Sequence, residues 1–106
     1  MNTMSRIIQI EQLLKDLPDD SFLKHALALE YIKISEDVKA REIFENLLTE
    51  DPKYIGSYYH LAKLYERNGA DELAIQTYEK GMELAKQLGD NHVYSELKSA
   101  WEDLTF

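Results

Sequence analysis

The sequence contains no cysteine among its 106 residues. This absence excludes disulfide bonds, zinc sites built on thiolates and a cysteine nucleophile together. It is compatible with a reducing compartment, and we expect the protein to act in the cytoplasm.

Residues that break helices are also scarce, with only four glycines and two prolines in the chain. The abundant Leu, Ala, Glu and Lys favour helix instead. There is no apolar run long enough to span a bilayer. We expect no signal peptide, because Gln9 and Glu11 interrupt the apolar N-terminal stretch and no small-residue cleavage site follows.

Basic residues are outnumbered, with 12 Lys and Arg against 20 Asp and Glu, which gives a net charge of -8. Nucleic-acid binding draws on clustered cations that neutralise phosphates. Attraction to an anionic membrane surface needs similar clusters. We therefore expect neither nucleic acid nor membrane as a partner.

The apolar residues recur at helical spacing along the whole chain, and 44% of the residues are hydrophobic, enough for one domain with a core. The pattern predicts six helices, at about 4–16, 21–34, 38–49, from Pro52 to Arg67, 71–87 and 91–104.

Residues that end or cap helices stand between these predicted helices. Pro18 ends the first helix, Gly69 supplies a left-handed cap after the fourth, and Gly89-Asp90 ends the fifth. The predicted N-terminal caps are Asp19, Asp20 or Ser21 for the second helix, Asp37 for the third and Asp71 for the fifth, with Pro52 in the first turn of the fourth.

The chain matches itself when it is shifted by 34 residues. The matched pairs stand at positions that packing, capping or chain breaking would require. They are Leu27 and Leu61, Ala28 and Ala62, Tyr31 and Tyr65, Asp37 and Asp71, Ala40 and Ala74, Phe44 and Tyr78, Glu45 and Glu79, and Pro18 and Pro52.

This pattern resembles the tetratricopeptide repeat, in which aromatic, Leu-Gly/Ala, Tyr, Ala, aromatic and Pro positions recur over 34 residues. Residues 21–54 carry Leu27, Ala28, Tyr31, Ala40, Phe44 and Pro52, and residues 55–88 carry Tyr58, Leu61, Ala62, Tyr65, Ala74 and Tyr78. Four residues depart from the pattern. Lys24 replaces the first aromatic, and Leu47 and Gly81 are larger and smaller than the usual Ala. Lys86 replaces the second Pro, so the fifth helix is expected to run on.

The resemblance implies an all-α fold, a right-handed superhelical stack of antiparallel helix pairs. It implies a single domain over residues 1–106. Its parts would be the helix of a partial repeat at 4–17, repeats at 21–54 and 55–88, and a C-terminal capping helix at 91–104.

The resemblance also implies a concave groove lined by the first helix of each repeat. Its predicted peptide-binding residues are Phe22, His25, Leu29, Ile32, Lys33, Tyr59, His60, Lys63, Glu66 and Arg67. Tyr94 and Leu97 are expected to extend this wall. The carboxylate clamp of chaperone-tail binders in this family is not expected, because His25, Leu29 and His60 stand where that clamp uses asparagine.

The predicted function is therefore a protein–protein interaction module that binds a peptide segment in a partly apolar, locally basic groove, without catalysis, cofactor or metal. The sequence contains no glycine elbow around a serine, phosphate-binding loop or zinc-protease helix motif. One alternative is a self-associating homodimer. A more remote alternative is a metal-dependent hydrolase built on His25, His60 and His92.

Overall fold

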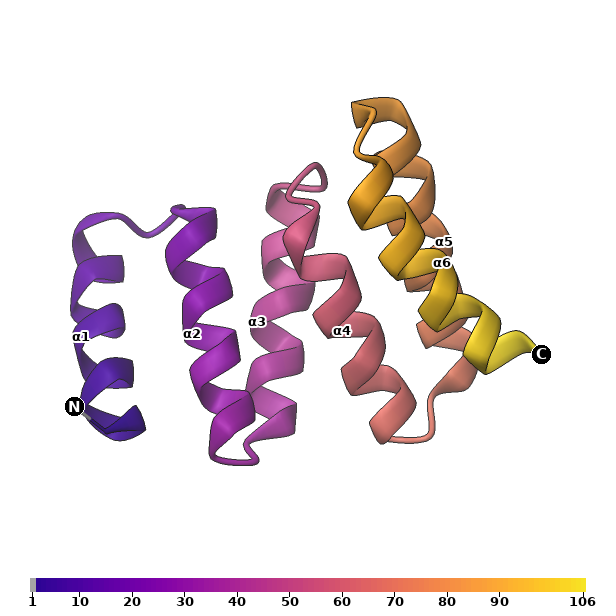
Figure 1. The fold of residues 1–106 in the computed structure, drawn as a ribbon. Helices are drawn as coiled ribbons and strands as arrows, with labels where there is room; N and C mark the ends of the chain where they lie inside the picture. Colours follow the sequence, from indigo (N-terminus) through magenta and orange to yellow (C-terminus); the bar gives the residue numbers. More distant parts are fainter. Residues whose placement is uncertain (1) are drawn as a thin grey trace. The chain divides into compact units, whose positions relative to one another are not determined.

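The structure is a computed structural model that describes residues 2–106. Residues 2–106 contain six α-helices and no strand (Figure 1), which confirms the all-α prediction. The helices are α1 (Thr3–Asp16), α2 (Ser21–Lys33), α3 (Asp37–Glu50), α4 (Gly56–Arg67), α5 (Asp71–Leu88) and α6 (Asn91–Thr105).

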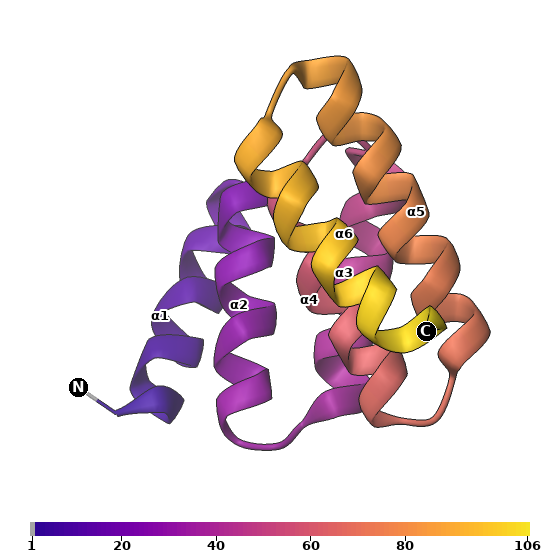
Figure 2. The same ribbon diagram turned by 45° about the vertical axis from the view of Figure 1, so that its right-hand side comes forward.

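The chain divides into two compact units, the first ending at Pro52 and the second covering Lys53–Phe106. In the first unit, α2 packs between α1 and α3. In the second unit, α5 packs against both α4 and α6. Figures 1 and 2 show that consecutive helices within each unit run antiparallel and are joined by short turns.

Four of the pairs matched by the 34-residue shift are buried on both sides and belong to the cores of the two units. The buried pairs are Leu27 and Leu61, Ala28 and Ala62, Ala40 and Ala74, and Phe44 and Tyr78. Alanine side chains with no exposed surface allow neighbouring helices to approach closely, and the large rings fill the space beside them. Periodicity in the sequence therefore identified residues that are buried for a common reason.

Three helices begin with a side-chain cap. Asn2, Asp20 and Asp90 accept hydrogen bonds from the backbone N–H groups of the residues three positions later, at 2.8, 2.9 and 3.1 Å. Each bond satisfies an amide that has no partner within its helix. Of the three residues predicted to cap α2, Asp20 is the one that does so.

The predictions for Asp37, Asp71 and Pro52 were wrong. α3 and α5 begin after Glu36 and Ala70, which make no side-chain capping bond, and the two aspartates are the first helical residues. There their charges favour the helix through its dipole. Pro52 lies in the turn before α4, which begins only at Gly56.

The C-terminal ends of α2 and α4 are built alike. Gly69 has a φ of 78°, as predicted for a left-handed cap, and the N–H of Ala70 donates to the carbonyl of Tyr65 at 2.8 Å. At the equivalent position, Ser35 has a φ of 60°, and the N–H of Glu36 donates to the carbonyl of Tyr31 at 2.9 Å. The same backbone motif is thus formed once with glycine and once with serine.

Helix α1 is covered on one side only. Ile7 and Ile10 are buried and pack in a cluster with Leu27 of α2. Leu13, near the C-terminal end of α1, and Leu17, just after it, are 51% and 53% exposed. Helix α5 continues to Leu88, as expected from Lys86 in place of the second proline of the repeat pattern.

Candidate functional site

The ten predicted binding residues lie on two helices, one in each unit. The α2 surface consists of Phe22, His25, Leu29, Ile32 and Lys33, and the α4 surface consists of Tyr59, His60, Lys63, Glu66 and Arg67. Spacings of three, four and seven residues put the members of each set on one face of their helix.

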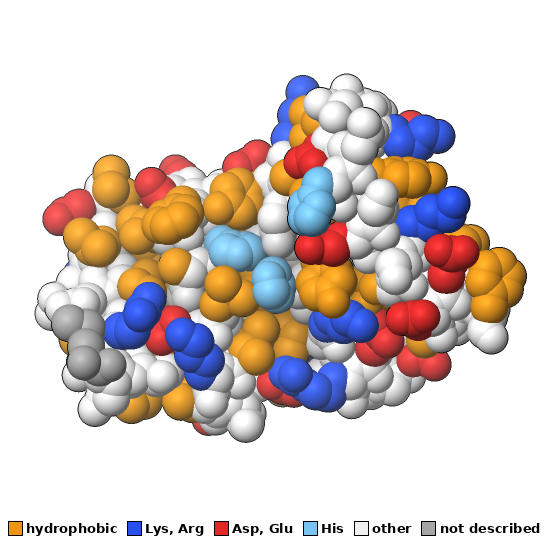
Figure 3. All heavy atoms as spheres, viewed as in Figure 1, with side chains coloured by type: hydrophobic (Ala, Val, Ile, Leu, Met, Phe, Trp, Pro, Cys, Tyr) orange, Lys and Arg blue, Asp and Glu red, His pale blue; other side chains and the backbone are white. Residues whose placement is uncertain are grey.

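The α2 surface combines a highly exposed aromatic side chain with half-buried aliphatic ones. Phe22 is 68% exposed, whereas Leu29 and Ile32 are half-buried. The His25 ring lies edge-on to the buried ring of Phe44 in α3, with 5.5 Å between centroids. Figure 3 shows hydrophobic side chains over α2 with basic side chains next to them.

A buried carboxylate that the sequence analysis missed lies beside this surface. Glu30 is only 3% exposed. One of its carboxylate oxygens accepts a hydrogen bond from Lys33 Nζ at 2.8 Å, and the other lies 3.4 Å from Arg6 Nε of α1 without forming a hydrogen bond. Buried charges need such partners, so Glu30 holds the Lys33 ammonium in place.

The sequence carries a signal for this arrangement. A shift of 34 residues aligns Glu30 with Leu64, which is buried in α4. A glutamate at a core position requires cations nearby, and Lys33 of the same helix and Arg6 of α1 provide them.

The α4 surface is a connected set of rings and charges. The Tyr59 ring meets the rings of His60 and Tyr78 edge-on, with centroid distances of 5.7 and 6.4 Å. Lys63 Nζ lies 5.5 Å from the Tyr59 centroid and 3.5 Å from a carboxylate oxygen of Glu66. Packing of this kind orients Tyr59 and Lys63 before any ligand arrives.

Two groups at the α4 surface have shifted pKa values. Burial lowers the pKa of His60 below its ordinary value of 6.5, and the carboxylate of Glu96 in α6 acts in the opposite direction. Burial also raises the pKa of Tyr78 in α5, and the hydrogen bond from its hydroxyl to Glu66 adds to that shift. His60 and Tyr78 are therefore both neutral at pH 7.

The positive charge of both surfaces is partly neutralised within the chain. Lys33 pairs with Glu30, and Lys63 pairs with Glu66, each on the same helix. The two lysines therefore carry less unbalanced charge than a count of basic residues predicts.

Leu97 was expected to extend the groove, but its side chain is fully buried next to Gly81 of α5. Tyr94, one turn earlier in α6, is half-buried.

Over residues 2–106, no three His, Asp or Glu side chains are placed to hold a metal ion, so nothing there supports the metal-dependent hydrolase. No helix in this part of the chain has the length and apolar character needed to cross a bilayer.

Comparisons by sequence alone find no family model and no curated protein that match this chain. Solved structures do match. A tetratricopeptide repeat domain protein from Salinibacter ruber, solved in solution, is 42% identical with a TM-score of 0.79, covering 83% of this chain and 89% of that one. The crystal structure of the Salinibacter domain gives 42% identity and a TM-score of 0.77 over 80% of this chain and 94% of that one.

A protein from Bordetella parapertussis is 26% identical, with a TM-score of 0.80 over 92% of this chain and 85% of that one. The TPR2B domain of yeast Sti1, in a complex with pHsp70, has a TM-score of 0.86 over 93% of this chain and 79% of that one. At 13% identity, the yeast domain shows likeness of fold alone.

Proposed function

This chain belongs to the tetratricopeptide repeat family, and from that membership we propose that it binds peptide segments of a partner protein through the α2 and α4 surfaces. Its fold is that of a protein–protein interaction module. We propose no catalysis, and the cytoplasmic location expected from the sequence stays a prediction.

The observation that carries this proposal is the exposure of Phe22. A phenylalanine that is 68% exposed, on the same helix face as Leu29 and Ile32, presents apolar area that a folded chain does not use for its own core. Contiguous exposed apolar residues mark interaction sites, and aromatic anchors carry much of the binding energy in such sites.

The cations have a different role. A carboxylate on the ligand would compete with Glu30 for Lys33 and with Glu66 for Lys63, because both lysines are already paired. Charged groups of this kind contribute more to partner selection and association rate than to affinity. The proposed ligand therefore has apolar anchors with acidic neighbours.

The yeast Sti1 domain supports peptide recognition by this fold, since it is found in complex with pHsp70. That partner belongs to the yeast protein. The asparagine positions of a chaperone-tail clamp are occupied here by His25, Leu29 and His60, so we propose a different ligand.

The test begins with capture of a partner from the source cell and mapping of the bound segment to a synthetic peptide. Calorimetric titration then compares the wild type with Phe22→Ser and with the double variant Lys63→Glu/Arg67→Glu. The matched control is Lys80→Glu/Lys86→Glu, which makes the same charge change at exposed positions of α5.

We expect both test variants to lose affinity while the control binds as the wild type does. Phe22→Ser should cost at least about 2 kcal/mol of binding free energy, the threshold for a hot-spot residue. Equal affinities for all four proteins would mean that the ligand uses neither surface.

Self-association remains the alternative, and the half-exposed apolar side chains of α1 favour it. They are Met4, Ile8 and Leu13, and Leu17 at the C-terminal cap of the helix is exposed to a similar degree. Light scattering after size exclusion, over a wide concentration range, separates the two functions. A mass that doubles with concentration, and that returns to the monomer value in Ile8→Glu/Leu13→Glu, would favour the homodimer.

A further inference from the structure

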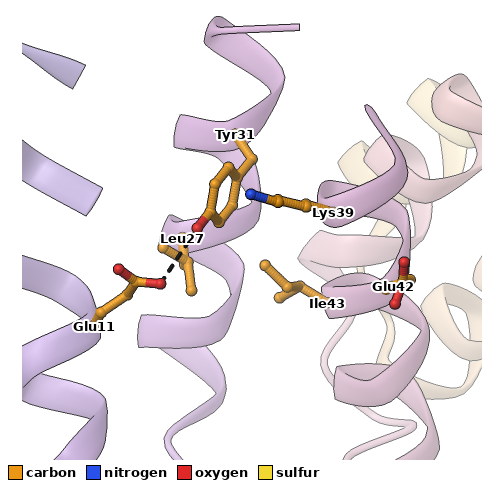
Figure 4. A pocket seen from close by; sticks show the side chains of 6 residues that line it. All are labelled: Glu11, Leu27, Tyr31, Lys39, Glu42 and Ile43. Carbon is orange, nitrogen blue, oxygen red and sulfur yellow. Dashed lines mark hydrogen bonds between the residues drawn. The ribbon is translucent and has the colours of Figure 1, made fainter. Parts of the chain in front are cut away.

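A second candidate site lies in the first unit, apart from the α2 surface. It is an open pocket of about 300 Å³, which we name the Tyr31 pocket. Figure 4 shows its lining, contributed by three helices: Glu11 of α1, Leu27 and Tyr31 of α2, and Lys39, Glu42 and Ile43 of α3.

The base of the Tyr31 pocket is apolar. Leu27 belongs to the buried cluster of this unit, and Ile43 and Tyr31 pack against that cluster. In Figure 4, Ile43 extends from α3 toward α2, and the Tyr31 ring stands above Leu27. A ligand entering here would therefore meet aliphatic carbons and one face of an aromatic ring.

The rim of the Tyr31 pocket is acidic. Glu11 accepts a hydrogen bond from the Tyr31 hydroxyl at 3.3 Å, and Glu42 lines the side formed by α3. The charge of Glu36 also reaches Tyr31. Because Lys39 is the single cation in the lining, carboxylates outnumber cations there.

Lys39 already shows how a cation fits this pocket. Its ammonium lies 5.4 Å from the centroid of the Tyr31 ring, within the range of a cation–π interaction. Lys39 is exposed, so its flexible side chain can leave the ring at little cost. A cation from outside could then take the same place.

We propose that the Tyr31 pocket binds an arginine side chain of a partner protein. The aliphatic stem would lie on Leu27 and Ile43, and the guanidinium would cover the Tyr31 ring in place of Lys39. A planar guanidinium can stack on the ring and still donate paired hydrogen bonds to Glu11 or Glu42, which an ammonium cannot do.

The charge of the whole chain supports this choice of ligand. At -8, the protein attracts basic segments over long range. The Tyr31 pocket thus takes the opposite ligand charge from the α2 and α4 surfaces, and it does not depend on the function proposed for them.

The experiment titrates the isotopically labelled full chain with a capped Gly-Arg-Gly peptide and follows backbone amide shifts. The control peptide carries citrulline in place of arginine, which keeps the shape and removes the charge. We expect saturable shifts in the amides of α1, α2 and α3 that line the pocket, and about fivefold weaker binding of the citrulline peptide.

Two variants report on the pocket itself. Glu11→Gln/Glu42→Gln should weaken arginine-peptide binding about fivefold or more, because it removes both rim charges. Lys39→Ala should strengthen binding, because it removes the internal competitor for the ring. Glu72→Gln/Glu83→Gln, at exposed positions of α5, makes the same charge change and should bind as the wild type does.

Equal binding of the two peptides would overturn the proposal, as would wild-type affinity in Glu11→Gln/Glu42→Gln. Equal losses in the α5 control would also overturn it, because they would show that net charge alone attracts the peptide. None of these results depends on the peptide-binding function of the α2 and α4 surfaces, so the two proposals can fail separately.

Discussion

Ser35 is the residue whose backbone is least suited to its side chain. It is the only non-glycine residue with positive φ among residues 2–106, and it repeats the hydrogen bonds made around Gly69. A side chain in the left-handed region costs about 1–2 kcal/mol, whereas glycine avoids that cost and loses some chain entropy instead.

We expect Ser35→Gly to raise the free energy of unfolding by about 0.5–1 kcal/mol. The reciprocal variant Gly69→Ser should lower it by a similar amount, because a side chain at residue 69 meets open space and only the backbone term changes. Urea unfolding of the two variants measures both values. A gain in stability from Gly69→Ser would show that backbone strain does not control these positions.

Tyr78 should make the protein sensitive to alkali. Burial, the Glu66 hydrogen bond and the Glu66 charge raise its pKa in the folded state above the ordinary value of 10. The stabilisation is therefore complete below pH 10, where the unfolded tyrosine is also neutral, and it is lost as the pH rises above that value.

Above about pH 10, the Tyr78 term should lower the free energy of unfolding by up to about 1.4 kcal/mol per pH unit. Chemical unfolding of the wild type and Tyr78→Phe, from about pH 9 to about pH 11, isolates this term by difference. The difference between the two proteins should shrink as the pH rises. Parallel profiles would show that Tyr78 does not titrate differently on unfolding.

At the scale of the helices, Gly81 of α5 lies where side chains of both α4 and α6 approach its backbone closely. A Cβ atom at this position would lie 2.9 Å from Tyr58 Cβ of α4 and 2.9 Å from Leu97 Cδ1 of α6. The leucine tip could rotate away, but Tyr58 Cβ moves only with its helix. Because Gly81 has no Cβ atom, the three helices can pack at this spacing.

We expect Gly81→Ala to destabilise the protein by about 1–2 kcal/mol, since overpacking costs more than the gain of about 1 kcal/mol in helix propensity. Lys80→Ala, at an exposed position of the same helix, should change stability by less than about 0.5 kcal/mol. Thermal and urea unfolding give both values. A more stable Gly81→Ala would mean that the three helices can separate at no cost.

At the scale of the whole molecule, the excess of negative charge causes long-range electrostatic repulsion. A net charge of -8 on 106 residues opposes the compact state through self-repulsion. The ion pairs of Lys33 and Lys63 act in the opposite direction, but both lysines have substantially exposed side chains. Solvent at the exposed lysines weakens both pairs, although the Glu30 carboxylate is itself buried.

Raising the salt concentration from about 20 mM to about 500 mM should therefore raise the melting temperature, because screening weakens repulsion more than it weakens the ion pairs. Differential scanning calorimetry at several salt concentrations measures the trend, with sodium sulfate avoided because it also strengthens hydrophobic burial. A falling melting temperature would assign the larger share of the electrostatic energy to the ion pairs.

Sequence pattern alone determined the helices, their order and most of the core. Ala28, Ala62, Phe44 and Tyr78 were identified because burial imposes a period of about 3.6 residues on a helix and the repeat imposes one of 34 residues. Both periods are local or regular properties of the chain, so one sequence is enough to reveal them. The positive φ of Gly69 was foreseen for a similar reason, since few residues adopt that conformation easily.

Tertiary structure alone decided which groups meet. Glu30 lies three residues before Lys33, a pairing that helical spacing allows, but its second cation is Arg6 of the preceding helix, which helical periodicity does not predict. The Tyr31 pocket likewise combines side chains from three helices, of which the repeat pattern identified only Leu27 and Tyr31, both as packing residues. Contacts between elements depend on helix spacing and on the direction of each side chain, and these are set only when the helices pack.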